Sequence, residues 1–484
     1  MRTAIFSANL LLLLACLTVS ASARAEPQSA TTTDWLEVRL DGQSIGQLES
    51  RRTVRDGQVH RVDALSMRLS RSGTELAFDS RAESTETLDG SPVAFRALSR
   101  GAGSERTVSG ELISPLRMRV QVDGDAEAKE QAWVRGALLG EGADLRLRAH
   151  GLKPGTSFSY VGFEPESLLF MPVDVRLVGW ETLRIDGAER KLFHVDQSVT
   201  VGGSAMRISH WYNADFELER ALMPMMGLNF ELVASERATM LTDAGSFDLL
   251  DAMLLGSPRA LSEAELAQPL RYRITLDDPN ARLINTAGQR TVRRGAGWEV
   301  RVDPLGGDPT PPNATDTSAN RWLEATDMQI VAAARKATAG APDAAAKMAA
   351  LTAFARARIT DKTLAIGYAS ALETLAAQAG DCTEHAVLLA ALARSIGIPA
   401  RVVSGLAYAP EFEGRTEVFV PHAWVQAWTG AQWRAFDAAL TDGFGAGHIA
   451  LAAGNGEPAG FLSAAAVLGQ IRIERIDAEP IARQ

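Results

Sequence analysis

Cysteine is scarce in this 484-residue chain, which contains only Cys16 and Cys382. Cys16 lies in an N-terminal stretch with the features of an export signal, so removal of that stretch leaves one thiol and no intramolecular disulfide. A single free thiol in an oxidising compartment is a liability unless it is buried or chemically useful. The shortage of cysteine therefore directs attention to Cys382.

Long apolar runs are also missing beyond the first 25 residues, which we expect to be a signal peptide. Arg2 gives a short positive region, and residues 11–19 are apolar but too short to span a membrane. Residues 23–25, Ala-Arg-Ala, match a small-x-small cleavage site. We expect export to the periplasm and no transmembrane span after cleavage. The stretch "LLAC" leaves open a lipid anchor on Cys16.

Positive charge is not in excess. The chain has 49 Lys and Arg against 59 Asp and Glu, a formal net charge of −10. No basic stripe with interleaved aromatics is present, so we expect no nucleic-acid partner.

The first half of the chain has the pattern of β-strands, and we predict a β-rich domain over residues 34–240. Residues 116–124 and 145–150 alternate apolar and polar positions, as half-buried strands do. Asp-Gly turn signals recur from residue 41 to residue 187. We expect antiparallel sheets here. A small β-containing segment is predicted at 241–305, with strands near 270–276 and 298–304.

The texture changes after a Pro-, Gly- and Thr-rich stretch at 306–320, which predicts a linker. Ala-rich helical patterns at 322–339 and 343–359 come first, and strands with short turns follow. We predict an α+β domain over 321–460 and a C-terminal segment at 461–484. The fold class is therefore α+β, with one or two antiparallel β-rich domains before the C-terminal domain.

Cys382 is predicted to lie at the start of a buried helix. Asp381 can cap that helix, and residues 383–396 are apolar nearly all round. A helix N-terminus favours the thiolate over the thiol and offers backbone N–H groups to an oxyanion. We therefore expect Cys382 to be a nucleophile with a lowered thiol pKa. The alternative interpretation of Cys382 is a buried, unreactive thiol.

A base for this thiol is expected from residues 420–440, which have the pattern of two strands joined by a short turn. If Gly430 and Ala431 form the turn, Thr429 pairs with Gln432, and His422 and Asp437 become diagonal neighbours on one face. Asp437 would then orient the imidazole.

These residues carry a resemblance. "GDCTEHAVLLAALARSIGIPARVVSG", "HAWVQAW" and "WRAFDAAL" resemble the three core motifs of the transglutaminase-like superfamily, over about residues 320–450. The resemblance implies a papain-like catalytic triad of Cys382, His422 and Asp437. The chain departs from many members at Gln426, where they have an acid, and at Ala438, where they have proline. Trp424 and Tyr368 are the two candidates for an oxyanion-binding side chain.

Other residues have simpler readings. Asp381 is expected to cap the helix, and Glu384 and His385 to pack or lie at its surface. Cys382 and His385 are too few for a zinc site, so no metal and no cofactor is expected. His448 is expected to be a loop histidine, with a place lining the cleft as the alternative.

The sequence thus predicts an exported cysteine acyl-transfer enzyme that acts on protein or peptide amide bonds through a thioester, with no organic cofactor. The resemblance slightly favours hydrolysis, by a protease or amidase, over transamidation. The substrate is expected to be a protein or peptide, with the cell envelope as one source. A non-enzymatic envelope-binding or scaffold protein is the alternative. A carrier of apolar ligands, built on the Met- and aromatic-rich residues 211–230, is the third.

Overall fold

The computed structural model describes residues 30–479, apart from 72–73, 102–103, 124–126, 202–203, 226–227, 236–252, 280, 362–368, 458–462 and 465–466. The chain divides into two compact units at residue 250. The expected signal peptide, including Cys16, and Tyr368 lie outside the described residues. No helix within the described ranges has both the length and the apolar character needed to cross a membrane.

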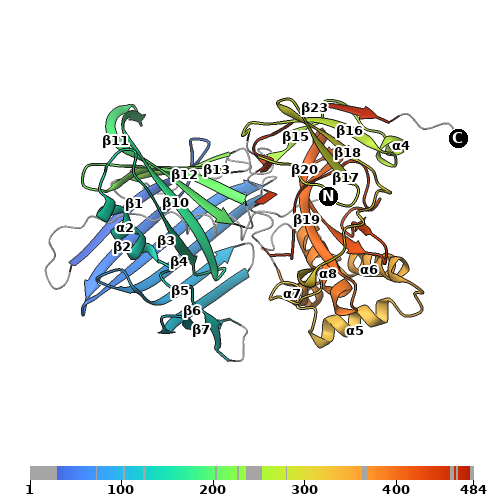
Figure 1. The fold of residues 1–484 in the computed structure, drawn as a ribbon, viewed down its shortest axis with the longest axis horizontal. Coiled ribbons are helices and arrows are strands. Elements are labelled where there is room, and N and C mark those ends of the chain that lie inside the picture. Colours follow the sequence, from blue (N-terminus) through green and yellow to red (C-terminus); the bar gives the residue numbers. More distant parts are fainter. Residues whose placement is uncertain are drawn as a thin grey trace. The chain divides into compact units, whose positions relative to one another are not determined.

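The N-terminal unit is an antiparallel sheet of fourteen strands (Figure 1). Their order across the sheet is β8-β7-β6-β5-β4-β3-β2-β1-β14-β13-β12-β11-β10-β9, so nearly every neighbour is a hairpin partner. The strands are β1 (Ala30–Leu40), β2 (Gln43–Arg55), β3 (Gln58–Arg71), β4 (Thr74–Thr87), β5 (Pro92–Gly101), β6 (Ser104–Ser114), β7 (Arg117–Val122), β8 (Lys129–Ala132), β9 (Ser157–Glu164), β10 (Leu169–Ile185), β11 (Ala188–Val201), β12 (Ser204–Tyr212), β13 (Leu218–Met225) and β14 (Leu228–Ser235).

This sheet is rolled, so that its two edges approach each other. Leu138, shortly after the edge strand β8, donates its backbone N–H to Val161 of the opposite edge strand β9, at 2.9 Å. The rings of Phe95 on β5 and Phe163 on β9 have centroids 5.0 Å apart. Trp133 packs against the same Phe163 at 4.8 Å. Aromatic side chains from distant strands therefore build one core inside the roll.

One predicted strand of this unit is wrong. Residues 145–150 belong to the helix α2 (Gly140–His150), not to a strand. Six alternating residues cannot separate the two periods when tertiary contacts favour the helix. Those contacts are visible at its start, where Glu86 on β4 accepts hydrogen bonds from the backbone N–H groups of Glu141 and Gly142, both at 2.9 Å. A carboxylate suits the positive end of a helix.

Two buried ion pairs attach α2 to the sheet. Arg52 on β2 forms a two-point pair with Glu141, with both N–O distances at 2.8 Å. Arg61 on β3 pairs with Asp144 at 2.6 Å. All four side chains are buried, so these charges are held by each other rather than by water.

The C-terminal unit contains a five-stranded sheet, a four-stranded sheet and a group of helices. The first sheet has the order β15-β20-β19-β22, with β21 paired to β20, and the second has the order β17-β18-β16-β23. The strands are β15 (Leu255–Gly256), β16 (Leu270–Leu276), β17 (Gln289–Arg294), β18 (Gly297–Val302), β19 (Ala400–Phe412), β20 (Arg415–Trp428), β21 (Trp433–Phe436), β22 (His448–Gly454) and β23 (Ile471–Ala478). The helices are α4 (Glu263–Leu266), the 3₁₀ helix η2 (Ala314–Asp316), α5 (Met328–Ala337), α6 (Ala344–Arg358), α7 (Ala371–Ala377) and α8 (Cys382–Ser395).

Helix α8 is the centre of this unit. Every residue from Cys382 to Arg394 is buried, as its apolar sequence predicts. It packs against β19 and β20 on one side and against α5, α6 and α7 on the other (Figure 1). The α+β fold class, with a β-rich N-terminal region and a helix-containing C-terminal domain, is confirmed.

The stretch 306–320, predicted as a linker, is attached to the C-terminal unit. The indole N–H of Trp433 donates to the Thr310 carbonyl at 2.9 Å, and Arg394 donates to the Ser318 carbonyl at 2.6 Å. Asp308 also pairs with the Trp433 backbone. Its Pro, Gly and Thr content therefore gives an irregular path over the surface, but one fixed by hydrogen bonds.

The buried pair that attaches α2 gives a stability prediction. Arg52→Leu should lower the free energy of unfolding of the N-terminal unit by about 3–5 kcal/mol, because it leaves the Glu141 carboxylate buried without its partner. Urea unfolding, followed by tryptophan fluorescence, measures this. Arg100→Leu is the matched control, since Arg100 and Glu105 form a pair with both side chains more than half exposed. Equal unfolding midpoints for the two variants would contradict the prediction.

Candidate functional site

Cys382 is the first residue of α8, and local hydrogen bonds fix this start. The Asp381 carboxylate accepts from the Thr383 backbone N–H at 2.7 Å. The Glu384 carboxylate accepts in return from the Asp381 backbone N–H at 3.0 Å. This reciprocal capping box confirms Asp381 as the cap. Glu384 and His385 are both buried, so they pack inside the unit rather than lie at a helix surface.

Glycine is required at position 380, directly before the cap. Its φ is +146°, in the region where only glycine is unstrained. A Cβ built there would lie 2.4 Å from the Cβ of Glu384. Gly380 thus lets the chain pass close to the first turn of α8 and enter the helix at Cys382.

The predicted register between β20 and β21 is confirmed. Trp428 pairs with Trp433 and Val425 with Phe436, and Thr429 donates its N–H to the Gln432 carbonyl at 3.0 Å. His422 and Asp437 therefore meet as expected. The Nε2 atom of His422 lies 2.7 Å from Oδ2 of Asp437, and both side chains are at most 1% exposed.

The Cys382 sulfur lies beside the same strand. The backbone N–H of Ala423, the residue after His422, donates a hydrogen bond to this thiol. The other ring nitrogen of His422, Nδ1, is buried and has no hydrogen-bond partner among the described residues. The imidazole is thus held at Nε2 by Asp437, while Nδ1 remains available on the strand that contacts the thiol.

The expected lowering of the Cys382 thiol pKa is wrong for this resting structure. Burial raises the pKa of the thiol well above its usual value, and the Asp381 carboxylate raises it further. The hydrogen bond from Ala423 acts in the opposite direction but is outweighed. The sequence argument counted the helix N-terminus and left out the loss of water, which here has the larger effect.

Asp437 is an anion in this buried place. Burial alone would raise its pKa, but the charge and hydrogen bond of His422, together with the His448 hydrogen bond, hold the pKa of the carboxyl well below its usual range. Its second oxygen, Oδ1, accepts from the backbone N–H groups of Ala439 and Leu440, at 2.7 and 3.0 Å. Both oxygens are therefore satisfied.

His448 is a part of this site that the sequence argument undervalued. Its Nε2 atom lies 3.0 Å from Oδ2 of Asp437, the oxygen that also binds His422. Its Nδ1 atom lies 3.2 Å from the backbone nitrogen of Gly445 and 3.1 Å from the carbonyl oxygen of the same residue. Burial lowers the pKa of His448, so the neutral ring can accept at Nδ1 and donate at Nε2. The nearby "GFGAGH" gave no signal of this, because pairing of β22 with β19 brings His448 back to Asp437.

The residues around Cys382, His422 and Asp437 match a known family profile. The sequence profile of the transglutaminase-like superfamily matches residues 331–438, which contain Cys382, His422 and Asp437. Residues 331–438 are a transglutaminase-like domain. An uncharacterized protein of Mycobacterium leprae is 41% identical over 69 residues, which are 14% of this chain and 24% of that protein. The chain thus matches about a quarter of that relative's length.

Solved structures similar to the chain are distant. A candidate cysteine protease from Cytophaga hutchinsonii has 18% identity and a TM-score of 0.28, over 44% of this chain and 85% of the other. A beta-barrel-like protein of unknown function from Brucella abortus has 11% identity and a TM-score of 0.34, over 44% and 100%. A candidate protease from Parabacteroides distasonis has 11% identity and a TM-score of 0.19, over 69% and 64%.

The transglutaminase-like domain also offers a group of metal-binding side chains. Ligand atoms of His422, Asp437 and His448 all lie within 4.8 Å of one another. Two imidazoles and a carboxylate suit Zn²⁺, which binds them at about 2.0–2.2 Å. The same three side chains already satisfy each other by hydrogen bonds of 2.7 and 3.0 Å. These three side chains therefore have the geometry of a hydrogen-bonded cluster and also the composition of a metal site.

Trp424 supplies a buried donor near the domain's histidines. Its indole ring stacks beside His422, with centroids 6.3 Å apart, and meets His448 edge-on at 5.1 Å. The indole N–H is buried without a hydrogen-bond partner among the described residues.

Gln426 stands where many members of the superfamily have an acid. It is buried, and its amide donates to the Ala287 carbonyl at 3.1 Å. A neutral amide serves that contact, and an acid could not donate there without a proton.

The raised thiol pKa leads to a reactivity prediction. Iodoacetamide should alkylate Cys382 in the folded protein more than about tenfold more slowly, near pH 7.5, than in the urea-unfolded chain, because only the thiolate reacts. The folded-state rate should increase as the pH is raised through about 9 and beyond, since the proton is retained in that range. Peptide mass spectrometry measures both rates. A folded-state rate that is already constant below about pH 7 would show a stable resting thiolate.

Proposed function

We propose that this chain is an exported cysteine acyl-transfer enzyme that acts on protein or peptide amide bonds through a thioester. One observation carries the proposal. His422 is held by Asp437 at Nε2, has Nδ1 free of described partners, and lies next to Ala423, whose N–H contacts the Cys382 sulfur. A thiol, an imidazole and a carboxylate are the groups that a thiol nucleophile and its base need.

Thiol attack begins the reaction. Because the resting thiol keeps its proton, His422 removes that proton through Nδ1 as the sulfur attacks the carbonyl carbon of the substrate amide. A C–S bond forms, and the carbonyl oxygen takes up negative charge. Asp437 stabilises the positive imidazolium through its hydrogen bond to Nε2, and remains an anion throughout.

The oxyanion requires hydrogen-bond donors in the same water-excluded site beside Cys382. Asp381 already accepts from the first-turn N–H groups of Thr383 and Glu384, so the backbone N–H of Cys382 and the unsatisfied indole N–H of Trp424 are the candidates that the structure offers. Buried donors without partners stabilise a developing charge well, because no water competes for them. Trp424 was one of the two side chains expected in this role.

Collapse of the tetrahedral adduct completes acylation. The C–N bond breaks, the imidazolium gives its proton to the departing amine, and a thioester to Cys382 is left. Water, deprotonated by His422, then attacks the thioester, releases a carboxylic acid and restores the thiol. An amine in place of water would give a new amide. We favour hydrolysis, because the family resemblance leans toward peptidases.

The proposed location agrees with the rest of the chain. The leader-like N-terminus supports export to the periplasm, and the absence of a basic surplus supports a protein or peptide substrate over nucleic acid. A fully reduced single thiol then has a chemical use that explains its retention.

The reaction is tested with a peptide mixture and mass spectrometry. The wild type should yield cleaved peptides, deamidated side chains or new isopeptides. Cys382→Ala and His422→Ala should abolish these products, and Asp437→Asn should slow them by roughly 10³-fold or more, because the imidazole loses its orienting anion. His150→Ala, at a half-buried histidine of α2 in the N-terminal unit, is the control and should act like the wild type.

The same variants separate the enzyme from a scaffold. A substrate-like thiol probe should label Cys382 in the wild type and lose that labelling in His422→Ala. Folded wild type that neither transforms peptides nor takes up the probe under reducing conditions would refute the enzymatic proposal and support a binding or scaffold role.

Chelation distinguishes the triad from a metal site. Because the proposed chemistry needs only protein groups, dialysis against EDTA should leave the rate unchanged within about twofold. Added Zn²⁺ should inhibit by occupying His422, Asp437 and His448 and removing the base. Loss of activity in EDTA, with recovery on addition of Zn²⁺, would instead assign the three side chains to a catalytic metal.

A further inference from the structure

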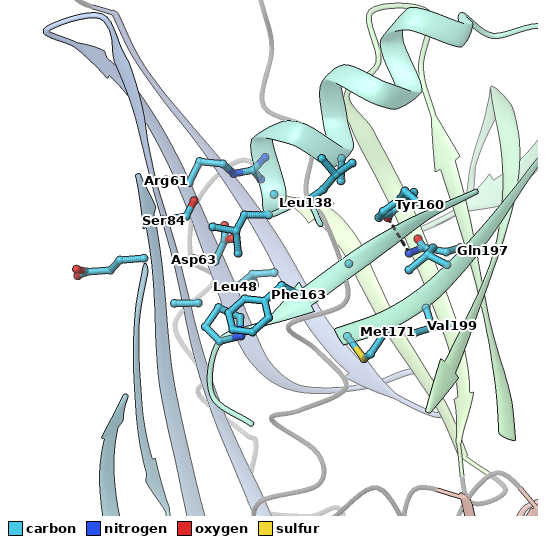
Figure 2. Close-up of a pocket in the computed structure, with 18 residues that line it drawn as sticks. Leu48, Arg61, Asp63, Ser84, Leu138, Tyr160, Phe163, Met171, Gln197 and Val199 are labelled. Carbon is cyan, nitrogen blue, oxygen red and sulfur yellow. Dashed lines mark hydrogen bonds between the residues drawn. The ribbon is translucent and has the colours of Figure 1, made fainter. Parts of the chain in front are cut away.

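The interior of the N-terminal unit contains a cavity. Its volume is about 110 Å³, and it lies between α2 and the inner faces of the rolled sheet (Figure 2). Cysteine is absent from the residues that line this cavity. The Met- and aromatic-rich stretch 211–230, suggested from sequence as the basis of an apolar carrier, contributes none of the lining residues that the structure describes.

Most of the cavity wall is apolar. Leu48, Leu138, Phe163, Met171 and Val199 line it, and they come from both halves of the sheet and from the segment before α2. Figure 2 shows Arg61, Asp63 and Ser84 on one side, with Tyr160 and Gln197 across from them. The Gln197 amide donates to the Tyr160 hydroxyl at 3.3 Å. An apolar body with a few convergent polar groups is the usual composition of a small-molecule site.

Charges at the wall disfavour an anion. Arg61 lies between two carboxylates: it pairs with Asp144 at 2.6 Å and is close enough to Asp63 to interact with it electrostatically. This cation is therefore already compensated, and the local balance is negative. A ligand carboxylate would meet repulsion from Asp63, while a buried ligand cation would lose its hydration in a mostly apolar space.

A second observation points to a polar ligand atom inside the roll. His210 on β12 is 1% exposed, and neither of its ring nitrogens has a hydrogen-bond partner among the described residues. It pairs with Val195 on β11, two residues from Gln197, so the strand period places it on the same face as Gln197, although His210 does not itself line the cavity. Burial lowers the pKa of His210 to about 4, so the ring is neutral. A buried imidazole without partners requires an explanation, and a hydrogen-bonding occupant provides one.

We propose that the rolled sheet binds an uncharged amphiphile, with an aliphatic chain among Leu48, Phe163 and Met171 and a hydroxyl or amide end toward Gln197, the lining residue on the same face as His210. A cavity of about 150 Å³ holds a benzene-sized molecule, so this one accepts a segment of about four to six non-hydrogen atoms. The site belongs to the N-terminal unit alone and is independent of the Cys382 chemistry.

Gly162 provides a direct way to close the cavity. It lines the wall on β9, and a Cβ added there would meet its nearest atom, Val173 Cγ2, at 3.5 Å, an ordinary contact. A larger side chain at this position can therefore extend into the cavity without displacing the backbone. Valine also suits a strand. Ala143 on α2 lines the opposite wall and gives a second, unrelated position.

The test is calorimetric titration of the full chain with 1-butanol, butylamine and sodium butyrate. Butanol should bind in the millimolar range or tighter, and butyrate at least about tenfold more weakly because of Asp63. Gly162→Val and Ala143→Leu should each weaken butanol binding by at least about tenfold. Val178→Leu, at a partly exposed position on β10, is the matched control and should bind as the wild type does.

Unfolding midpoints of the unliganded variants show that each one folds. Cys382→Ala should bind butanol normally, so the outcome does not depend on the proposed enzyme. The proposal is overturned if none of the three probes binds, if butyrate or butylamine binds most tightly, or if a folded Gly162→Val or Ala143→Leu variant binds butanol as well as the control.

Discussion

The hydrogen bonds to Asp437 are the constraint on which the site depends. One carboxylate oxygen receives His422 and His448, and the other receives two backbone N–H groups. A fully buried carboxyl is normally neutral, and four donors are what keep this one ionised. Because it is an anion, the His422 ring is fixed with Nε2 toward it and Nδ1 away from it, which is the orientation that a base for Cys382 requires.

The exclusion of water has opposite effects at Asp437 and at Cys382. It strengthens the hydrogen bonds at Asp437, since no water competes for them. At Cys382 it raises the thiol pKa, since a buried thiolate has little to stabilise it beyond the Ala423 N–H. The resting state is therefore a neutral thiol beside the Asp437 anion. In the proposed reaction, the imidazolium and the oxyanion form only when a substrate carbonyl is present to receive the sulfur.

The features that could be predicted from the sequence are those that local residue patterns determine. The β20–β21 register followed from a two-residue turn, and the cap at Asp381 followed from its place before an apolar helix. Helix α2 was missed because six alternating residues have no preference strong enough to resist the Glu86 cap and the two buried ion pairs. For His448, a place lining the cleft was only the alternative, because its link to Asp437 arises from the pairing of β22 with β19, which no local pattern specifies.

The buried polar groups of this protein are of two kinds: those that pair with each other and those without a hydrogen-bond partner among the described residues. In the N-terminal unit, Arg52 and Arg61 are matched by Glu141 and Asp144, and their cost is compensated by pairing that fixes α2. His210, Trp424 and the Nδ1 atom of His422 have no such compensation among the described residues. Leaving a buried polar atom unpaired costs about 1–3 kcal/mol. An arrangement that retains such atoms gains from them only when another molecule supplies the missing partner, which is the physical reason to expect one ligand in each unit.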